Sequence, residues 1–349
     1  MSIVVKQSFF NLITIGVAFI IGAVNTLYLY PTFLGSKLQG LVIALLAISN
    51  IIQPFLSFGT QHAVIRFYSR YRSNKEKNAV LTLSLIIPII VTAIVIPLFY
   101  LYYDQIKVLL FQTENAFSQY AYVILFIAVS TSFFEIFYSW VRVKLKSVFG
   151  NFLKELYPRL LVTFLLISYT LDYLDFENFI LYLIYGYYLR LLIVMVYSFI
   201  INKPKISFYF KNDFKEILRY SFLILLSGAA SSIILDIDKS MLSSILTVEN
   251  VAYYSVAIFI AAVIEIPGRA MFQILSPIVA EVINKNNKKK LKYLLKKSST
   301  NLVLVSSLFF LIINLNLNDF YEMLNQEGYN KGIPIVIIVS FAKLYSMSI

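Results

Sequence analysis

Residues 66–102 decide the fold, and they read RFYSRYRSNKEKNAVLTLSLIIPIIVTAIVIPLFYLY. The first part carries cations at Arg66, Arg70, Arg72, Lys75 and Lys77, whereas residues 80–102 have no charged side chain. The apolar part reaches the roughly 20 residues that an α-helix needs to cross a bilayer. A basic cluster next to such a run is typical of a membrane helix whose basic end stays in the cytoplasm.

Similar apolar runs recur along the chain. We expect about ten transmembrane helices, at residues 9–30, 41–58, 80–102, 120–140, 156–174, 179–201, 220–235, 251–272, 301–317 and 333–349. Basic clusters follow the second, fourth, sixth and eighth of these spans, and the other connections hold few Lys or Arg residues. This alternation predicts an all-α polytopic membrane protein with a cytoplasmic N-terminus.

The composition agrees with a chain whose main solvent is lipid. Hydrophobic residues make up 59% and charged residues 14%, the mean hydropathy is +0.78, and soluble domains average about 25% charged residues. The net charge of +12 lies in short connections beside the spans. The orientation of the protein in the membrane and attraction to anionic membrane lipids therefore explain the net charge, and nucleic-acid binding is not needed to explain it. Without cysteine, the chain has neither a disulfide framework nor a thiolate metal site.

Missing motifs narrow the function further. The sequence has no G-x-x-x-x-G-K-[ST] phosphate loop and no H-E-x-x-H pair, so ATP hydrolysis and zinc chemistry lack their usual residues. The connections are too short for a catalytic domain outside the membrane, so we expect no enzyme. His62, at the cytoplasmic end of the second span, is predicted to be an interfacial side chain rather than a proton relay. The bundle is expected to transport, conduct or scramble a substrate.

An internal repeat suggests two lobes. Gly16 and Gly228 are separated by the same number of residues as Gly40 and Ala252, and Pro54 and Pro267 by one more. We therefore predict two pseudo-symmetric six-helix lobes related by an axis along the membrane normal, with chance matching as the alternative. The lobes would comprise residues 1–215 and 216–349. The second would hold four helices, so it is expected to be incomplete and the chain truncated at its C-terminus.

Two regions carry a family resemblance. The first contains YLYPTFLG at 28–35, Gly40, FGT at 58–60 and Arg66-Phe67, and the second contains LDIDK at 235–239, AYYSVA at 252–257, Ile266-Pro267 and SPIVA at 276–280. These stretches resemble the polysaccharide-export and O-antigen (Wzx-type) flippases of the multidrug/oligosaccharidyl-lipid/polysaccharide superfamily. The order of the spans resembles that family along the whole chain. Specific sequence motifs of the family occur only in these two regions.

The resemblance implies a protein of the bacterial cytoplasmic membrane. It would move undecaprenyl-diphosphate-linked oligosaccharide from the cytoplasmic to the outer leaflet by alternating access, for cell-surface polysaccharide or O-antigen synthesis. Its partners would be the lipid-linked oligosaccharide and other membrane proteins of polysaccharide assembly. No cofactor is implied, and coupling to a H⁺ or Na⁺ gradient is left open.

Ionisable residues within or beside the spans are the candidates for a cationic cavity. Arg190, in the sixth span, is the first choice because its guanidinium binds phosphate oxygens in a fork and keeps its charge. The alternative is an ion pair with Glu135 of the fourth span. Arg66 and Arg142, at cytoplasmic span ends, either guide an anionic headgroup or only set the topology.

The second half holds the remaining candidates. Glu265 and Arg269 are four residues apart on the eighth span, where a structural ion pair is favoured. Lys343 lies in the last span, where it faces the cavity or marks a bundle that lacks helices. Asp236 and Asp238 are expected at the outer end of the seventh span, and their spacing does not place both on one helix face.

Three further expectations concern a stretch of small residues and two alternative functions. The small residues 227–232, SGAASS, predict a close approach of the seventh span to a neighbouring helix. A cation-coupled multidrug (MATE-type) antiporter is one alternative function, and it would need an acidic site in the first lobe, where Glu135 is the acid within a span. A membrane scaffold without transport activity is another.

Overall fold

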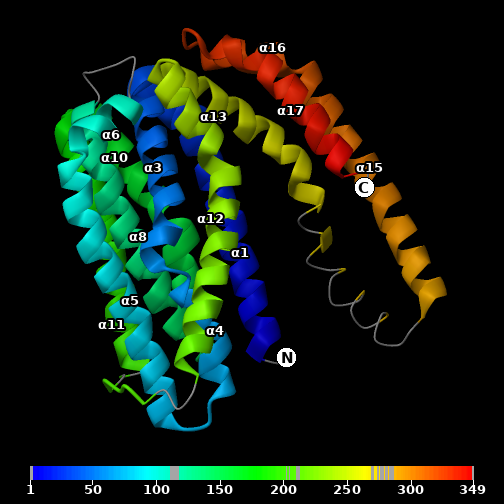
Figure 1. Ribbon diagram of the computed structural model, residues 1–349. Coiled ribbons are helices and arrows are strands. Elements are labelled where there is room, and N and C mark those ends of the chain that lie inside the picture. The colour runs from blue at the N-terminus through cyan, green and yellow to red at the C-terminus, as the bar shows by residue number, and fades with distance from the viewer. Residues whose placement is uncertain are drawn as a thin grey trace. The chain divides into compact units, whose positions relative to one another are not determined.

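The computed structural model describes residues 3–110, 118–201, 203, 205–209, 213–268, 271–272, 275, 279, 282 and 287–347. These residues form helices and the connections between them, and no strand occurs among them (Figure 1). Contacts between Cα atoms divide the chain into two compact units. Unit 1 comprises residues 1–25 and 37–251, and unit 2 comprises residues 26–36 and 252–349.

Unit 1 is a bundle of long helices. Its elements are α1 (Ile3–Val24), α3 (Gly35–Ser57), α4 (Thr60–Arg70), α5 (Asn74–Leu101), α6 (Tyr103–Leu110), the 3₁₀ turn Gln119–Ala121, α8 (Tyr122–Arg142), α9 (Ser147–Asn151), the π-turn Phe152–Leu156, α10 (Tyr157–Thr170), α11 (Phe176–Ile201) and α12 (Phe214–Ile245). α8 packs against α11, α4 and α5, so it is the central helix of this unit.

Aromatic and branched aliphatic side chains fill the core of unit 1. Phe67, Phe134 and Trp140 are almost fully buried in a cluster with residues of α5 and α11. The indole N–H of Trp140 donates to Ser84 Oγ at 3.1 Å. This hydrogen bond satisfies the polar atom that burial of a tryptophan would otherwise leave unpaired.

Unit 2 is smaller and contains the second described cluster. Its elements are the π-turn Asn25–Leu29, α2 (Tyr30–Phe33), α13 (Val248–Ala262), the 3₁₀ turn Val263–Glu265, α15 (Lys288–Leu315), α16 (Leu317–Leu324), the 3₁₀ turn Tyr329–Gly332 and α17 (Ile333–Ser346). Tyr253 of α13 packs edge to face against Tyr329, with ring centroids 5.1 Å apart. Gly328, with φ +82°, brings the connecting loop against the Tyr253 ring, where a Cβ would clash.

The predicted all-helical membrane fold is confirmed. Eight helical stretches among the described residues are long and apolar enough to span a membrane, namely Phe9–Phe33, Gly35–Ser57, Asn74–Leu101, Gln119–Arg142, Phe176–Ile201, Phe214–Ile245, Val248–Gly268 and Lys288–Leu315. The other two expected spans contain α10 and α17, each with 14 residues of regular α-helix. Large apolar side chains remain exposed along these helices, such as Ile20, Ile90 and Phe164, as expected of surfaces that face lipid.

One helix boundary differs from the sequence prediction. α12 continues without a break to Ile245, so Asp236 and Asp238 lie inside it rather than at the outer end of a span that stops at Leu235. Lys239 Nζ lies 2.5 Å from Asp236 Oδ1. This i, i+3 ion pair compensates the buried part of the carboxylate charge, so the helix does not have to end there.

α12 also bears on the expected lobes. The internal repeat assigns this helix to the second lobe, whereas its packing places it in unit 1 against α4. The compact units therefore do not follow the division at residue 215. The predicted lobes are defined by a pseudo-symmetric repeat, and the compact units are defined by packing. The two pseudo-symmetric lobes therefore stay a prediction.

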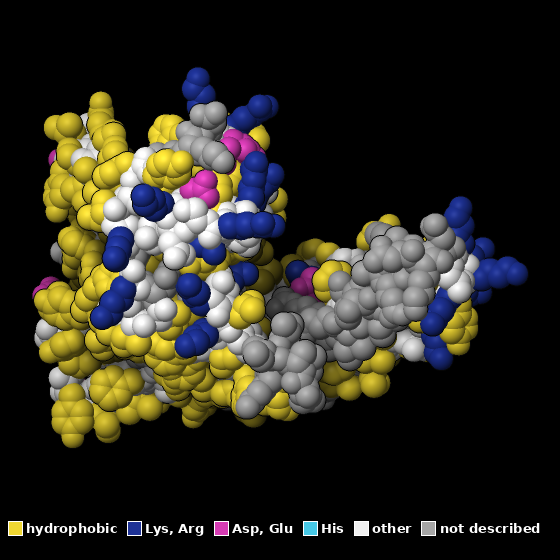
Figure 2. All heavy atoms as spheres, turned by 90° about the horizontal axis from the view of Figure 1, so that it is seen from below, with side chains coloured by type: hydrophobic (Ala, Val, Ile, Leu, Met, Phe, Trp, Pro, Cys, Tyr) yellow, Lys and Arg dark blue, Asp and Glu magenta, His cyan; other side chains and the backbone are white. Residues whose placement is uncertain are grey.

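Cations gather at one end of unit 1. Lys77 from the α4–α5 connection and Lys144 from the α8–α9 connection both lie over the ring of Tyr68, at 5.5 and 5.4 Å. Figure 2 shows the Lys and Arg side chains spread across this end of the molecule. The two basic connections that the sequence places on one side of the membrane therefore lie together in space.

Candidate functional site

A polar cavity of about 420 Å³ lies within unit 1. α3, α4 and the turn between them, α8, the π-turn before α10, and α12 supply its walls. The residues that line it are Gln53, Pro54, Gly59, Gln61, His62, Ile65, Glu135, Ser139, Arg142, Lys154, Ile224, Leu225, Ser227, Gly228, Ser231 and Ser232. Hydroxyl, amide and charged groups thus meet in one cavity between the helices.

One wall of the cavity is charged. Lys154 Nζ lies 2.7 Å from Glu135 Oε1, and the Arg142 guanidinium and Lys154 Nζ lie 5.6 and 6.0 Å from the centre of the Tyr138 ring. Tyr138 itself packs closely on Gly150, where an added Cβ would lie 2.3 Å from the ring. Because two cations face one carboxylate, this wall has a net positive charge, which suits an anionic group.

The opposite wall carries uncharged polar groups. Ser227, Ser231 and Ser232 of α12 line it, and a Cβ added to Gly228 would have no heavy atom within 4 Å. The small residues at 227–232 were expected to allow a close helix contact, and this prediction is wrong at Gly228, which faces open space. Gly228 lines the cavity instead, together with these serines.

Two amide groups of the lining lack partners. Gln53 Nε2 and Gln61 Oε1 are buried atoms without a hydrogen bond within the described part of the chain. A buried polar atom without a partner costs free energy. A hydroxylated ligand in the cavity can supply the missing hydrogen bonds.

His62 also lines the cavity and is exposed to solvent. It belongs to α4, outside the spanning stretches. Desolvation by the surrounding protein lowers the pKa of His62 below its ordinary value of 6.5, Glu135 acts in the opposite direction, and Arg142 and Lys154 lower it further. The lowered pKa favours the neutral form of His62 and so reduces its positive charge in the cavity.

Arg190, the first candidate from the sequence, is not among the residues that line this cavity. Its side chain is buried in α11, with the guanidinium carbon 4.3 Å from the centre of the Phe134 ring and 4.6 Å from that of Tyr187. One nitrogen donates to Thr131 Oγ1 at 3.2 Å, and Nε has no partner among the described residues. Its alternative partner, Glu135, pairs with Lys154 instead. A substrate-binding role for Arg190 stays a prediction.

The other charged residues that the sequence suggested for the cavity lie at separate places in the structure. Arg142 lines the cavity, whereas Arg66 lies over the Tyr220 ring at 4.3 Å. Asp236 accepts a hydrogen bond from Asn50 at 3.2 Å, and Asp238 accepts one from the backbone of Lys239 at 2.9 Å. In unit 2, Lys343 lies 2.7 Å from Glu265. Arg269, the predicted partner of Glu265, lies outside the described residues.

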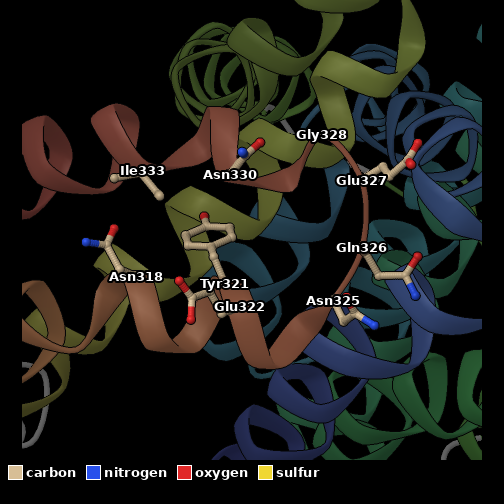
Figure 3. Close-up of a pocket in the computed structure, with 9 residues that line it drawn as sticks. All are labelled: Asn318, Tyr321, Glu322, Asn325, Gln326, Glu327, Gly328, Asn330 and Ile333. Carbon is tan, nitrogen blue, oxygen red and sulfur yellow. The ribbon is translucent and has the colours of Figure 1, made fainter.

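Unit 2 has a separate pocket of about 670 Å³. Figure 3 shows it between α16 and the start of α17, with Asn325, Gln326 and Glu327 on the connecting loop. Glu322 and Glu327 line it, and none of the lysines and arginines that the structure describes does. Since its charge would repel a phosphate, the cavity of unit 1 is the better candidate for an anionic substrate.

Sequence reasoning missed part of the site. The sequence assigns Lys154 to a basic cluster that sets the topology. It does not select Gln53 and Gln61, because a single glutamine forms no recognisable motif. The available signal was their polarity next to membrane spans. Their convergence on Glu135 and Arg142 depends on how four separate segments pack.

These features define a class of protein: a multi-pass helical membrane protein with a polar, net cationic cavity between its helices. Comparison with protein families adds the family. The polysaccharide biosynthesis protein family matches residues 4–282, and the chain belongs to this family. Its members are membrane transporters and are generally not enzymes. Searches of curated proteins and of solved structures gave no match.

Proposed function

We propose that this protein translocates a lipid-linked oligosaccharide across the bacterial cytoplasmic membrane, with the N-terminus in the cytoplasm. The observation that carries this proposal is the polar cavity of unit 1, with Arg142 and Lys154 on one wall, in a member of a polysaccharide biosynthesis family. A diphosphate and its sugars cannot cross hydrocarbon unaided, because unpaired charges and hydroxyl groups are costly there.

The two walls suit the two parts of such a substrate. Arg142 and Lys154 can donate charge-assisted hydrogen bonds to phosphate oxygens. The serines of α12 and the unpartnered amides of Gln53 and Gln61 can bind sugar hydroxyl groups, since amides and hydroxyls both donate and accept. The polyprenyl chain would stay in lipid while rocking of the helices changes the side to which the cavity opens.

The alternative of a cation-coupled drug antiporter has less support. Such a carrier needs a carboxylate that is free to bind a cation, and Glu135, the acid of this cavity, is already paired with Lys154 at 2.7 Å. Coupling of translocation to a H⁺ or Na⁺ gradient is compatible with either function.

Reconstituted protein tests the proposal. Proteoliposomes containing a fluorescent undecaprenyl-diphosphate oligosaccharide report translocation when an impermeant quencher reaches one leaflet only. We expect Arg142→Gln and the double variant Glu135→Gln/Lys154→Gln each to lower the rate about 10-fold, because each removes a charge-assisted hydrogen bond to phosphate. The double variant avoids leaving Glu135 without its partner.

Lys146→Gln is the matched control, because Lys146 is exposed in the α8–α9 connection and does not line the cavity. It should translocate at the wild-type rate. An inserted, folded wild type that moves no lipid-linked sugar at all would contradict the proposal. Equal rates for wild type and both cavity variants would place the substrate site elsewhere.

A further inference from the structure

α4 and the first turns of α12 are joined by a set of polar contacts at the basic end of unit 1. Arg70 Nη1 donates to both carboxylate oxygens of Glu216, at 2.8 and 2.9 Å. The Tyr71 hydroxyl donates to Asp213 Oδ2 at 2.8 Å. The Arg66 guanidinium lies over the Tyr220 ring. We call these contacts the α4–α12 latch.

The latch continues into a close backbone contact. Gly59, in the turn before α4, has φ +67°, and a Cβ on it would lie 2.4 Å from the carbonyl oxygen of Ser221 and 2.9 Å from the backbone nitrogen of Leu225. Only a residue without a side chain allows α12 to come so close. From Asp213 to Leu225, one side of α12 is therefore held against α4 and the turn that precedes it.

The cavity begins where this contact ends. Gly59 and Leu225 belong both to this backbone contact and to the cavity lining, and the next residues of α12 at the cavity wall are Ser227 and Gly228. Further along α12, Asn50 of α3 donates a hydrogen bond to Asp236 at 3.2 Å. The cavity is thus bounded at the basic end by the contact of α12 with α4, and α12 packs against α6 as well.

We propose that the α4–α12 latch is the gate that closes the substrate cavity toward the cytoplasmic side. The proposal rests on the proposed function, which supplies the need for a gate and the orientation of the basic end. When the latch opens, the start of α12 separates from α4, and the cavity between Gly59 and Ser231 widens toward the cytoplasm.

The chemistry of the latch suits repeated opening. Both side chains of the Arg70–Glu216 pair are about half exposed, and exposed ion pairs are individually weak. Water can therefore solvate the separated partners, which a large apolar contact would not allow. Burial and the hydrogen bond to Asp213 raise the pKa of Tyr71, so Tyr71 stays a neutral hydrogen-bond donor at physiological pH.

Site-specific labelling tests the gate directly, because the chain has no cysteine of its own. A Ser231→Cys variant carries one thiol at the cavity wall, and a membrane-impermeant maleimide added to inside-out vesicles measures its access from the cytoplasmic side. We expect Arg70→Glu and Glu216→Arg each to raise the labelling rate about fivefold. The exchanged pair Arg70→Glu/Glu216→Arg should return the rate to within about twofold of the parent.

Lys107→Glu is the matched control, since it disrupts another exposed ion pair, with Asp104 at 2.8 Å, away from the latch. It should leave the labelling rate unchanged. Unchanged rates in both single latch variants would overturn the proposal, as would an equal increase in the Lys107 control or a lack of recovery in the exchanged pair.

A reversible cross-link provides a second test that does not depend on how well the charge-reversal variants fold. A cleavable thiol-to-thiol linker between Arg70→Cys and Glu216→Cys should block translocation, and cleavage of the linker should restore it. The same linker between Lys288→Cys and Lys292→Cys, one turn apart on α15, should have no effect.

If labelling responds but wild type moves no lipid-linked sugar, the latch stands and the proposed function fails. If translocation occurs but the cross-link does not block it, the latch fails alone.

Discussion

His62 reports on the electrostatics of the cavity, and as the single histidine of the chain it gives one resolvable NMR signal. Its folded-state pKa is lowered below 6.5, mainly by desolvation. Because the unfolded chain binds this proton more readily, the contribution of His62 to stability is constant above pH 6.5. The protein loses stability as the pH falls from 6.5 through the folded-state pKa.

We expect a titration of labelled His62 in detergent to give a pKa below 6.5. Glu135→Gln should lower it further, since it removes the carboxylate that raises it. A value at or above 6.5 in wild type would contradict the expected desolvation.

Substitution of Arg190 tests whether this buried cation stabilises the folded protein. Its guanidinium lies between the Phe134 and Tyr187 rings, and a desolvated cation–π contact contributes about 2 kcal/mol. Arg190→Ala should therefore reduce the free energy of unfolding by about that amount, measured by denaturation in detergent. Arg190→Met keeps most of the volume without a buried charge and should lose less. If Arg190→Met is stable yet inactive in translocation, Arg190 acts on the substrate instead.

At the scale of elements, the turn between α3 and α4 sets how α12 packs. Gly59 and Gly35 both have φ near +67°, but only a Cβ on Gly59 would meet another backbone. Either Gly→Ala variant has the same conformational cost of about 1–2 kcal/mol. We expect Gly59→Ala to lose about 1–3 kcal/mol more than Gly35→Ala, measured by thermal unfolding. Equal losses would mean that α12 does not approach Gly59 as closely as the structure has it.

The helices also show where sequence reasoning reaches its limit. The apolar runs located the spanning helices well, because an uncharged run of sufficient length is a local property. The end of α12 was misplaced, because Asp236 and Asp238 look like the start of a polar connection. Their place inside the helix depends on Lys239 and on Asn50 of α3, and Asn50 is too distant in sequence to be anticipated.

At the scale of the whole molecule, the alternating basic clusters predict which connections share a side of the membrane. Single cysteines at Lys77 and Lys144 should react with an impermeant maleimide from the cytoplasmic side. A cysteine at Glu327, in an odd-numbered connection, should react from the outside. Labelling of Lys77→Cys and Lys144→Cys from opposite sides would conflict with the packing of both parent side chains against Tyr68.

The sequence by itself determined that this protein is an all-helical, multi-pass membrane protein and pointed to its family. Hydrophobicity, span length and charge distribution act locally along the chain, and so can be recognised without a structure. Of the charged residues that it nominated for a cavity, Arg142 and Glu135 line the one described in unit 1.

The tertiary structure decided which side chains meet. It pairs Glu135 with Lys154 rather than with Arg190, places Arg190 against two aromatic rings, and turns Gly228 of α12 toward open space. Each outcome depends on the rotation and spacing of helices that are far apart in sequence. Helix packing fixes these quantities through the shapes of all the contacting side chains, so no single stretch of sequence encodes them.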